Sequence, residues 1–187
     1  MSADAGTNRL GEVRSDEPPE AVRPPTTALP PRAGDVPRTY RGLPHTQLDQ
    51  QPDARVRAQL ARRFGGFVGV EFVDVEEKAS RVRAPGARAL FLCPDVEAGP
   101  AEAFLVDREF AHLHALPDSS LHMVLPGSLA ARAVEAGWAE VHPGAAAGIV
   151  PATTVLIYAP RDAGEIDVVL DLLRCSYENA RGIRYQP

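Results

Sequence analysis

The alternation of apolar residues on either side of Pro117-Asp118 is the feature that most constrains how this chain can fold. The flanking segments, 110–115 and 120–125, place apolar side chains at odd positions: Ala111, Leu113, Ala115, Leu121, Met123 and Leu125. Because a strand turns successive side chains to opposite faces and Pro-Asp favours a turn, the pattern predicts a hairpin with its odd positions buried. Paired positions must then add to an even number, such as 113 with 123 and 114 with 122, since a one-residue slip would expose the apolar face.

Histidines occupy the even positions of this predicted hairpin. His112 and His114 share one face of the first strand, and the required register places His122 on the same face of the second. A fourth histidine, His142, follows in the segment Trp138-Ala139-Glu140-Val141-His142-Pro143. Four of the five histidines in the chain therefore lie in one short stretch, which is where we expect its chemistry.

Three kinds of role are open to this set of histidines. Neutral imidazole is a common ligand of zinc, iron and copper, and a His-x-His pair on a strand presents two ligands together. An imidazole also titrates near neutral pH and can act as a general acid or base. Each histidine can instead be a polar strand residue that forms only local hydrogen bonds. Cupins also use His-x-His, but the glutamate and glycine spacing of a cupin is absent from this sequence.

Three segments have the caps and the apolar spacing of helices. The first begins with Asp53 as its N-cap and ends at Gly65-Gly66, since glycine accepts the left-handed conformation found there. The second covers 128–136 and ends at Gly137. The third is capped by Asp162, with Glu165 three residues further on as in a capping box. Their predicted inward residues are Val56, Leu60 and Phe64; Leu129, Ala133 and Val134; and Ile166, Val169, Leu170, Leu173 and Tyr177.

Further strands are predicted at 67–75, 80–83, 88–93, 103–106 and 153–159, where β-branched and aromatic residues gather between turn signals. With the hairpin and the three helices, they predict an α+β fold: a mostly antiparallel sheet with helices packed on one side. A chain of 187 residues suits one such domain.

The first part of the chain differs in composition from the rest. Nine of the 18 prolines precede residue 53, among charged residues and without any apolar period. Such a segment buries too little apolar surface to offset the loss of conformational entropy on ordering. We therefore predict a disordered Pro-rich tail at 1–43 and a folded domain at 44–187.

Composition also limits the classes of partner. A net charge of -5 argues against a nucleic-acid partner, and no stretch approaches the roughly 18 apolar residues of a membrane span. The N-terminus has no apolar signal region, and two cysteines in apolar runs, Cys93 and Cys175, suggest no disulfide framework. We expect a cytoplasmic protein with a small-molecule partner. The single lysine among 20 basic residues favours a GC-rich bacterial source. The oligomeric state is left open.

Several short pieces follow one another in a characteristic order: Arg108-Glu109-Phe110-Ala111-His112-Leu113-His114, Ser120-Leu121-His122, Gly137-Trp138, Glu140, His142-Pro143, Tyr158-Ala159-Pro160-Arg161 and Glu165. This succession resembles the luciferase domain family, which includes the fungal luciferases and many bacterial proteins. The resemblance covers roughly residues 87–182.

The resemblance implies a shared fold and pocket, and a shared type of chemistry. Fungal luciferases add molecular oxygen to a hydroxylated pyranone, without flavin or ATP, and the resulting peroxide breaks down with emission of light. The resemblance therefore implies a small cofactor-independent oxygenase that acts on an enolic or phenolic metabolite. Two alternatives remain: a module that binds a small aromatic ligand without turnover, and a metalloprotein that holds a transition metal through His112, His114 and His122.

The implied catalytic residues are His112, His114, His122, His142 and Arg161, and the implied substrate-binding residues are Trp138, Tyr158, Ser120 and Glu140. A histidine would remove the substrate proton, and Arg161 would hold the enolate with its fixed fork of donors. An ordinary salt bridge at the start of a helix is the alternative for Arg161. Unlike the fungal enzymes, which carry an N-terminal membrane anchor, this chain begins with a Pro-rich tail, so membrane association is not carried over. The bacterial members belong to organisms with no reason to make the fungal luciferin, so the fungal substrate and light emission are not carried over either.

Overall fold

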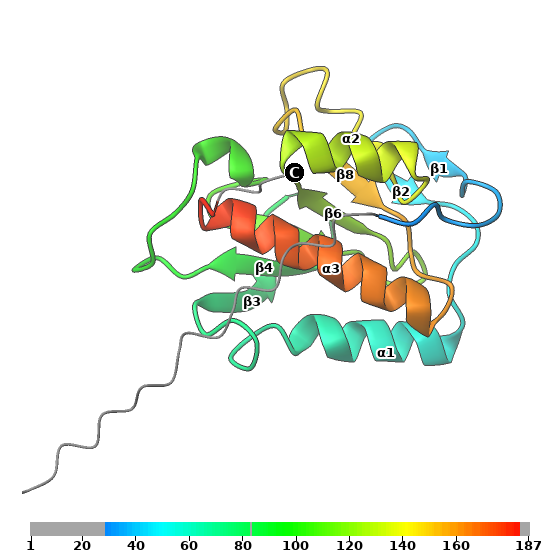
Figure 1. The fold of residues 1–187 in the computed structure, drawn as a ribbon, viewed down its shortest axis with the longest axis horizontal. Coiled ribbons are helices and arrows are strands. Elements are labelled where there is room, and N and C mark those ends of the chain that lie inside the picture. Colours follow the sequence, from blue (N-terminus) through cyan, green and yellow to red (C-terminus); the bar gives the residue numbers. More distant parts are fainter. Residues whose placement is uncertain (1–28, 83, 184–187) are drawn as a thin grey trace, which may run out of the picture.

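A computed structural model describes residues 29–82 and 84–183 (Figure 1). A six-stranded sheet runs in the order β3-β4-β5-β6-β8-β7, and every neighbouring pair in it is antiparallel. Its strands are β3 (Val75–Ala79), β4 (Arg88–Leu92), β5 (Glu109–Leu113), β6 (Leu121–Val124), β7 (Ala139–Val141) and β8 (Thr154–Ile157). A separate two-stranded ribbon joins β1 (Thr39–Tyr40) to β2 (Thr46–Gln47).

Three α-helices lie on one side of the sheet: α1 (Ala54–Gly65), α2 (Gly127–Glu135) and α3 (Ala163–Ala180). In Figure 1 they lie in front of the strands, with α3 crossing the middle of the sheet. A 3-10 turn, η1 (Ala101–Ala103), completes the regular elements. The predicted fold class, an antiparallel sheet with helices on one side, is confirmed. No helix among the described residues has the length and apolar character needed to cross a bilayer.

The helix starts follow the predicted local chemistry. The side chain of Asp53 accepts a hydrogen bond from Val56 N at 2.8 Å, and that of Asp162 accepts one from Glu165 N at 2.9 Å. Each cap satisfies a backbone N–H that has no partner within its helix. The predicted inward residues of α1 and α3 are buried. In α2, Ala130 is buried where Val134 was predicted, and Val134 remains 37 % exposed.

The central hairpin has the predicted parity. His112 pairs with His122, Ala111 with Met123 and Leu113 with Leu121, so paired positions add to an even number. The pairing is offset by two residues from the pairs suggested by the sequence, because His114 N donates to Ser120 O and closes a shorter loop. Burial determines which face each residue occupies, whereas the loop length determines the offset.

Several predicted strands are wrong. Residues 67–74 form turns, with Val70 and Val73 at 86 % and 85 % exposure, because Gly69 takes a positive φ and Phe72 N returns to Phe67 O. Residues 80–82 form a bend, and 103–106 combine the end of η1 with an isolated bridge. The first helix ends at the predicted position, but Gly66 has φ −66°, so the predicted left-handed glycine at its end is wrong.

The segment before residue 44 enters the structure earlier than the predicted domain boundary. Trp138 Nε1 donates to Pro30 O at 2.6 Å, and Arg32 N donates to Ala136 O at 2.8 Å. The strand β1 also lies within this segment. Residues 29–43 therefore pack against the domain, whereas the tail predicted for residues 1–28 lies outside the described residues.

Candidate functional site

The face of the sheet opposite the helices carries a row of functional side chains. Across neighbouring strands, His112 pairs with His122, His122 with Leu156, and Leu156 with Glu140. Residues paired directly across a sheet project to the same side. The odd-numbered partners Ala111, Leu113, Leu121 and Met123 belong to the hydrophobic core on the helix side. The alternation that buries the core thus presents His112 and His122 together on the other face.

All five histidines of the chain meet on this face, and we call them the histidine cluster: His45, His112, His114, His122 and His142. His122 is central. Its Nδ1 lies 3.1 Å from Nε2 of His112 and 3.1 Å from Nε2 of His114, and its Nε2 lies 3.2 Å from Nδ1 of His45. The ring of His142 stands edge-on to His122, with 4.7 Å between centroids. Every member is buried.

His45 was not predicted as a site residue. It immediately precedes β2, in a segment without apolar periodicity, and it reaches the cluster only through the packing of this segment over the sheet. The one sequence signal was its residue type, since it is the fifth histidine of a chain in which the other four already cluster.

Three carboxylates stand behind the histidine cluster. Glu109 Oε1 is 2.8 Å from His112 Nδ1, Asp118 Oδ2 is 2.6 Å from His114 Nδ1, and Glu140 Oε1 is 2.6 Å from His45 Nε2. A carboxylate accepts hydrogen bonds, so the ring nitrogen that faces it carries the N–H. In a neutral ring, the other nitrogen, which points into the cluster, then carries a lone pair.

The carboxylates are themselves held in place. Glu109 is fully buried and also accepts hydrogen bonds from Ser80 Oγ and Arg81 N, both at 2.8 Å. Asp118 accepts from Ser120 Oγ at 2.6 Å. Burial alone would raise the pKa of Asp118, but the hydrogen bonds from His114 and Ser120 hold it below its usual value. Asp118 therefore remains an anion behind His114.

Burial is the first cause of the altered titration of the histidines. It lowers the pKa of His45 and His112, and it lowers that of His122 well below the usual value, where the neighbouring imidazoles act in the same direction. Burial also lowers the pKa of His142 to about 4. These four rings are neutral near pH 7, so each carries one proton and one lone pair.

A cavity of about 580 Å³ opens above the histidine cluster. All five members of the histidine cluster line it, together with Arg81. The rest of its wall is mostly apolar, with Leu43, Pro44, Val82, Leu105, Ile149 and Val150. A volume and lining of this kind suit a small, largely apolar ligand with one polar end.

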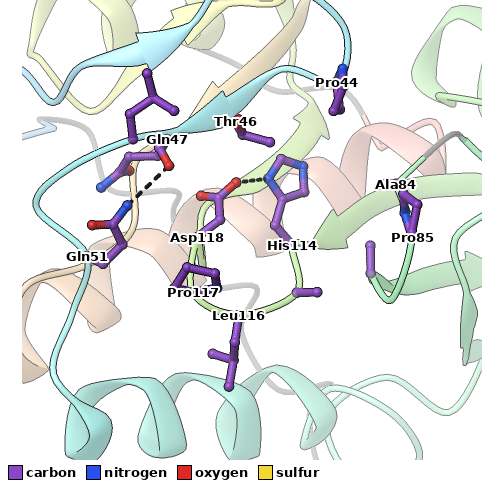
Figure 2. A pocket seen from close by; sticks show the side chains of 13 residues that line it. Pro44, Thr46, Gln47, Gln51, Ala84, Pro85, His114, Leu116, Pro117 and Asp118 are labelled. Carbon is purple, nitrogen blue, oxygen red and sulfur yellow. Dashed lines mark hydrogen bonds and ion pairs between the residues drawn. The ribbon is translucent and has the colours of Figure 1, made fainter.

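A second cavity, of about 410 Å³, lies on the other side of His114. Figure 2 shows it between Pro44, Gln51, Leu116 and Pro117, with the bond between His114 and Asp118 at its centre. The His114 side chain therefore borders both cavities.

The histidines could also hold a metal ion. Two groups of three have ligand atoms within 4.8 Å of one another: His112, His114 and His122, and His45, His122 and His142. The first is the group that the sequence suggested.

The remaining predicted residues divide into two sets. Ser120 and Glu140 contact the cluster through Asp118 and His45, and the charge of Glu140 acts on the Tyr158 phenol. Burial, followed by the charge of Glu140, raises the pKa of Tyr158 to about 12, so the phenol stays protonated. None of these residues, nor Arg161 or Trp138, is among those that line the cavity of the histidine cluster.

Arg161 and Trp138 instead hold the N-terminal segment. Arg161 forms an ion pair with Glu165 and donates to Ala33 O at 2.6 Å. The Trp138 indole donates to Pro30 O, as described above. For Arg161, the structure therefore shows the salt bridge at a helix start rather than an anion holder in the histidine cavity.

Comparison with known proteins finds a family match over the part of the chain that contains four of the five histidines. Residues 107–176 match the family model described as luciferase domain. The chain is 30% identical over 158 residues to luciferases of Armillaria ostoyae and Armillaria mellea, covering 79% of this chain and 59% of each relative. A luciferase of Neonothopanus nambi is 30% identical over 99 residues, which cover 48% of this chain and 37% of the relative. This chain thus spans less than two thirds of the length of these relatives. No solved structure matches it.

Proposed function

Because this chain belongs to the luciferase domain family, we propose that it is a small oxygenase whose substrate is an enolic or phenolic metabolite. The metabolite binds in the cavity above the histidine cluster. The observation that carries this proposal is the set of lone pairs of His112, His114 and His122, which converge at the floor of a largely apolar cavity.

The convergence of these ring nitrogens leaves a place for one proton among them. Nε2 of His112 and of His114 both face Nδ1 of His122 at 3.1 Å, and lone pairs at this distance repel one another unless a cation lies between them. A proton removed from an acidic hydroxyl of the substrate supplies that charge. The carboxylate of Asp118, on the far side of His114, then stabilises the imidazolium that forms.

The proposed reaction needs only substrate and oxygen. His114 takes the hydroxyl proton, which leaves an enolate with excess electron density at its α-carbon. That carbon forms a bond to one atom of dioxygen, so the substrate loses two electrons and the oxygen is reduced to the peroxide level. The imidazolium returns the proton to the terminal oxygen, and the product is an α-hydroperoxy carbonyl compound. No flavin, nucleotide or external reductant enters this balance.

The remaining cavity residues position the substrate. His142 Nδ1 accepts a hydrogen bond from Gly144 N at 3.0 Å, so the proton of this neutral ring is on Nε2, where it can be donated to the substrate anion. The apolar wall, which includes Leu43 and Ile149, excludes water from the ring of the metabolite. Exclusion of water strengthens the hydrogen bonds that hold the anion.

Oxygen consumption tests the proposal. Purified protein is incubated with a panel of hydroxypyranones and catechols, and dissolved oxygen is followed with an electrode. With an accepted substrate, we expect His114→Gln and Asp118→Asn to lower kcat by about 10²–10⁴-fold, the range of a lost general base. The control is Arg38→Met, which changes an exposed residue of the same domain.

Two outcomes would contradict the proposal. Unchanged turnover in both the His114 and the Asp118 variants would remove the histidine cluster from the reaction. Saturable binding of panel compounds without any oxygen uptake would instead favour a binding module without turnover.

A further inference from the structure

The geometry points to a mononuclear site for a divalent first-row transition metal, with Nε2 of His112, Nε2 of His114 and Nδ1 of His122 as its ligands. This inference goes beyond the proposed oxygenation and does not depend on it, because a metal count on protein without substrate tests it alone. It concerns which cation occupies the centre of the histidine cluster.

Hydrogen bonding determines the tautomers around this centre. Glu109 and Asp118 accept hydrogen bonds from Nδ1 of His112 and His114, so Nε2 of each ring is the nitrogen left to bind a cation. His45 gives its Nε2–H to Glu140, which leaves a lone pair on its Nδ1, 3.2 Å from His122 Nε2. His122 satisfies that lone pair by carrying its proton on Nε2. Its Nδ1 is then a third lone pair, facing the other two.

The distances also suit a metal ion. Two ligand nitrogens lie about 2.8–3.4 Å apart when each metal–nitrogen bond is about 2.0–2.1 Å and the angle between the bonds is about 90–110°. His122 Nδ1 is 3.1 Å from Nε2 of both His112 and His114. All three nitrogens lie within 4.8 Å of one another. The two pairs that include His122 are thus spaced as neighbouring ligands of one ion.

The second group of three histidines does not fit in the same way. His142 Nδ1 accepts a hydrogen bond from Gly144 N, so the proton of this ring is on Nε2 and neither nitrogen has a free lone pair. His122 Nε2 is used as a donor to His45. The ligand set is therefore His112, His114 and His122, and His142 is excluded from it.

The residues behind the ligands complete the site. Histidines that bind metals usually donate their other N–H to a carboxylate or a carbonyl, which orients the ring and raises its basicity. Glu109 and Asp118 do this directly for two of the ligands. For His122, the same function passes through His45 to Glu140. His45 and Glu140 are thus positioning residues, and the three carboxylates supply negative charge near a buried dication.

The metal site and the proposed reaction share the same cavity. His114 and His122 line it, so an ion among the three nitrogens has an open side towards the substrate. A metal bound there would use the His114 lone pair, so the proton transfer to His114 belongs to the metal-free protein. The substrate class stays the same.

Metal content of the purified full-length chain is the first test. Elemental analysis after expression with added Zn²⁺, Fe²⁺ or Cu²⁺, and desalting, should give about one equivalent of one of these metals per chain. X-ray absorption of the loaded wild-type protein should show three nitrogen ligands at about 2.0–2.1 Å for zinc. This measurement needs no variant, so it holds even where a variant fails to fold.

Variants then test the ligand set. His112→Gln and His122→Gln should lose the metal, whereas His142→Gln, which changes a histidine of the same cluster, should retain it. Glu140→Gln should weaken metal affinity by about 10–100-fold, as for other residues behind a ligand. Circular dichroism of each variant identifies any that do not fold.

The inference is overturned if folded wild-type protein holds less than about a tenth of an equivalent and is not stabilised against heat by any of the three metals. The cluster then holds a proton, and the proposed oxygenation is unaffected. It is equally overturned if the His142 variant loses metal as completely as the His122 variant. Oxygen uptake by metal-free protein tests the proposed oxygenation, whereas the metal content tests the metal site, so either proposal can fail without the other.

Discussion

Replacement of Arg32 by methionine tests whether the segment before residue 44 is part of the domain. The Arg32 side chain is 3% exposed and lies between the rings of Trp138 and Tyr158, with its guanidinium carbon 5.6 and 5.5 Å from their centroids. Its Nη2 donates to Ala159 O and to Glu165 Oε2, both at 3.0 Å. Methionine keeps the apolar stem and removes every donor.

The size of the effect follows from these contacts. Two hydrogen bonds from a charged group contribute about 1.5–3 kcal/mol each, and stacking on two rings adds about 1–2 kcal/mol. Against this, Nε and Nη1 of Arg32 are buried without a hydrogen-bond partner, which costs about 1–2 kcal/mol for each atom. Glu165 keeps its ion pair with Arg161 after the change, so no buried charge is orphaned. We expect a net loss of about 2–3 kcal/mol.

Urea unfolding followed by circular dichroism measures this loss, and thermal unfolding should show a Tm lower by roughly 5–10 °C. Arg38→Met is the matched control, since Arg38 lies in the same segment but is 78% exposed and pairs only with Asp49 at the surface. It should change stability by less than about 0.5 kcal/mol. If Arg32→Met and Arg38→Met have equal, small effects, the segment does not contribute to the stability of the domain.

Two further predictions concern stability. Leu121→Ala should lower the free energy of unfolding by about 2–5 kcal/mol, since Leu121 is fully buried on the helix side of the sheet, whereas Val70→Ala, at 86% exposure, should stay within about 0.5 kcal/mol in the same urea titration. Burial alone would raise the pKa of Glu165, but hydrogen bonds from Arg161 and Arg32 hold it below the ordinary 4.5. The contribution of Glu165 to the free energy of unfolding is therefore fully present above pH 4.5 and is lost as the pH falls through the folded-state pKa. Glu165→Gln should therefore be less stable near neutral pH and lose less stability on acidification; a parallel loss in both proteins would refute this.

The elements that could be predicted are those whose signal is local. The cap and stripe of α3 are contained in one stretch of sequence, and so is the alternation that sets the faces of β5 and β6. The predicted strand at 67–75 failed because its composition suits a strand but none of the strands in the described part of the chain pairs with residues 67–74. Val70 and Val73 are consequently exposed, and pairing begins only at Val75. Composition thus predicts whether a residue suits a strand, whereas pairing depends on the rest of the fold.

The candidate site shows the same division on a larger scale. Alternation alone brings His112 and His122 together, because both lie on one hairpin. His45 reaches them from a segment 77 residues before His122, and no periodicity in that segment indicates where it packs. Such a contact depends on tertiary packing and not on any local pattern.

The N-terminal segment and the residues that follow it contact the surroundings of the site at two points, Arg32 and His45. The Arg32 guanidinium lies over the Tyr158 ring, the charge of Glu140 acts on the Tyr158 phenol, and Glu140 accepts a hydrogen bond from His45, which follows directly after this segment. A loosened contact at Arg32 therefore bears on Glu140, the group that orients His45 and, through it, His122. Arg32→Met should thus weaken metal binding as well as stability, whereas Leu121→Ala, on the opposite face of the sheet, should lower stability without a comparable effect on metal affinity in protein that remains folded. Equal metal affinity in the two folded variants would mean that the segment covers the cluster without helping to position it.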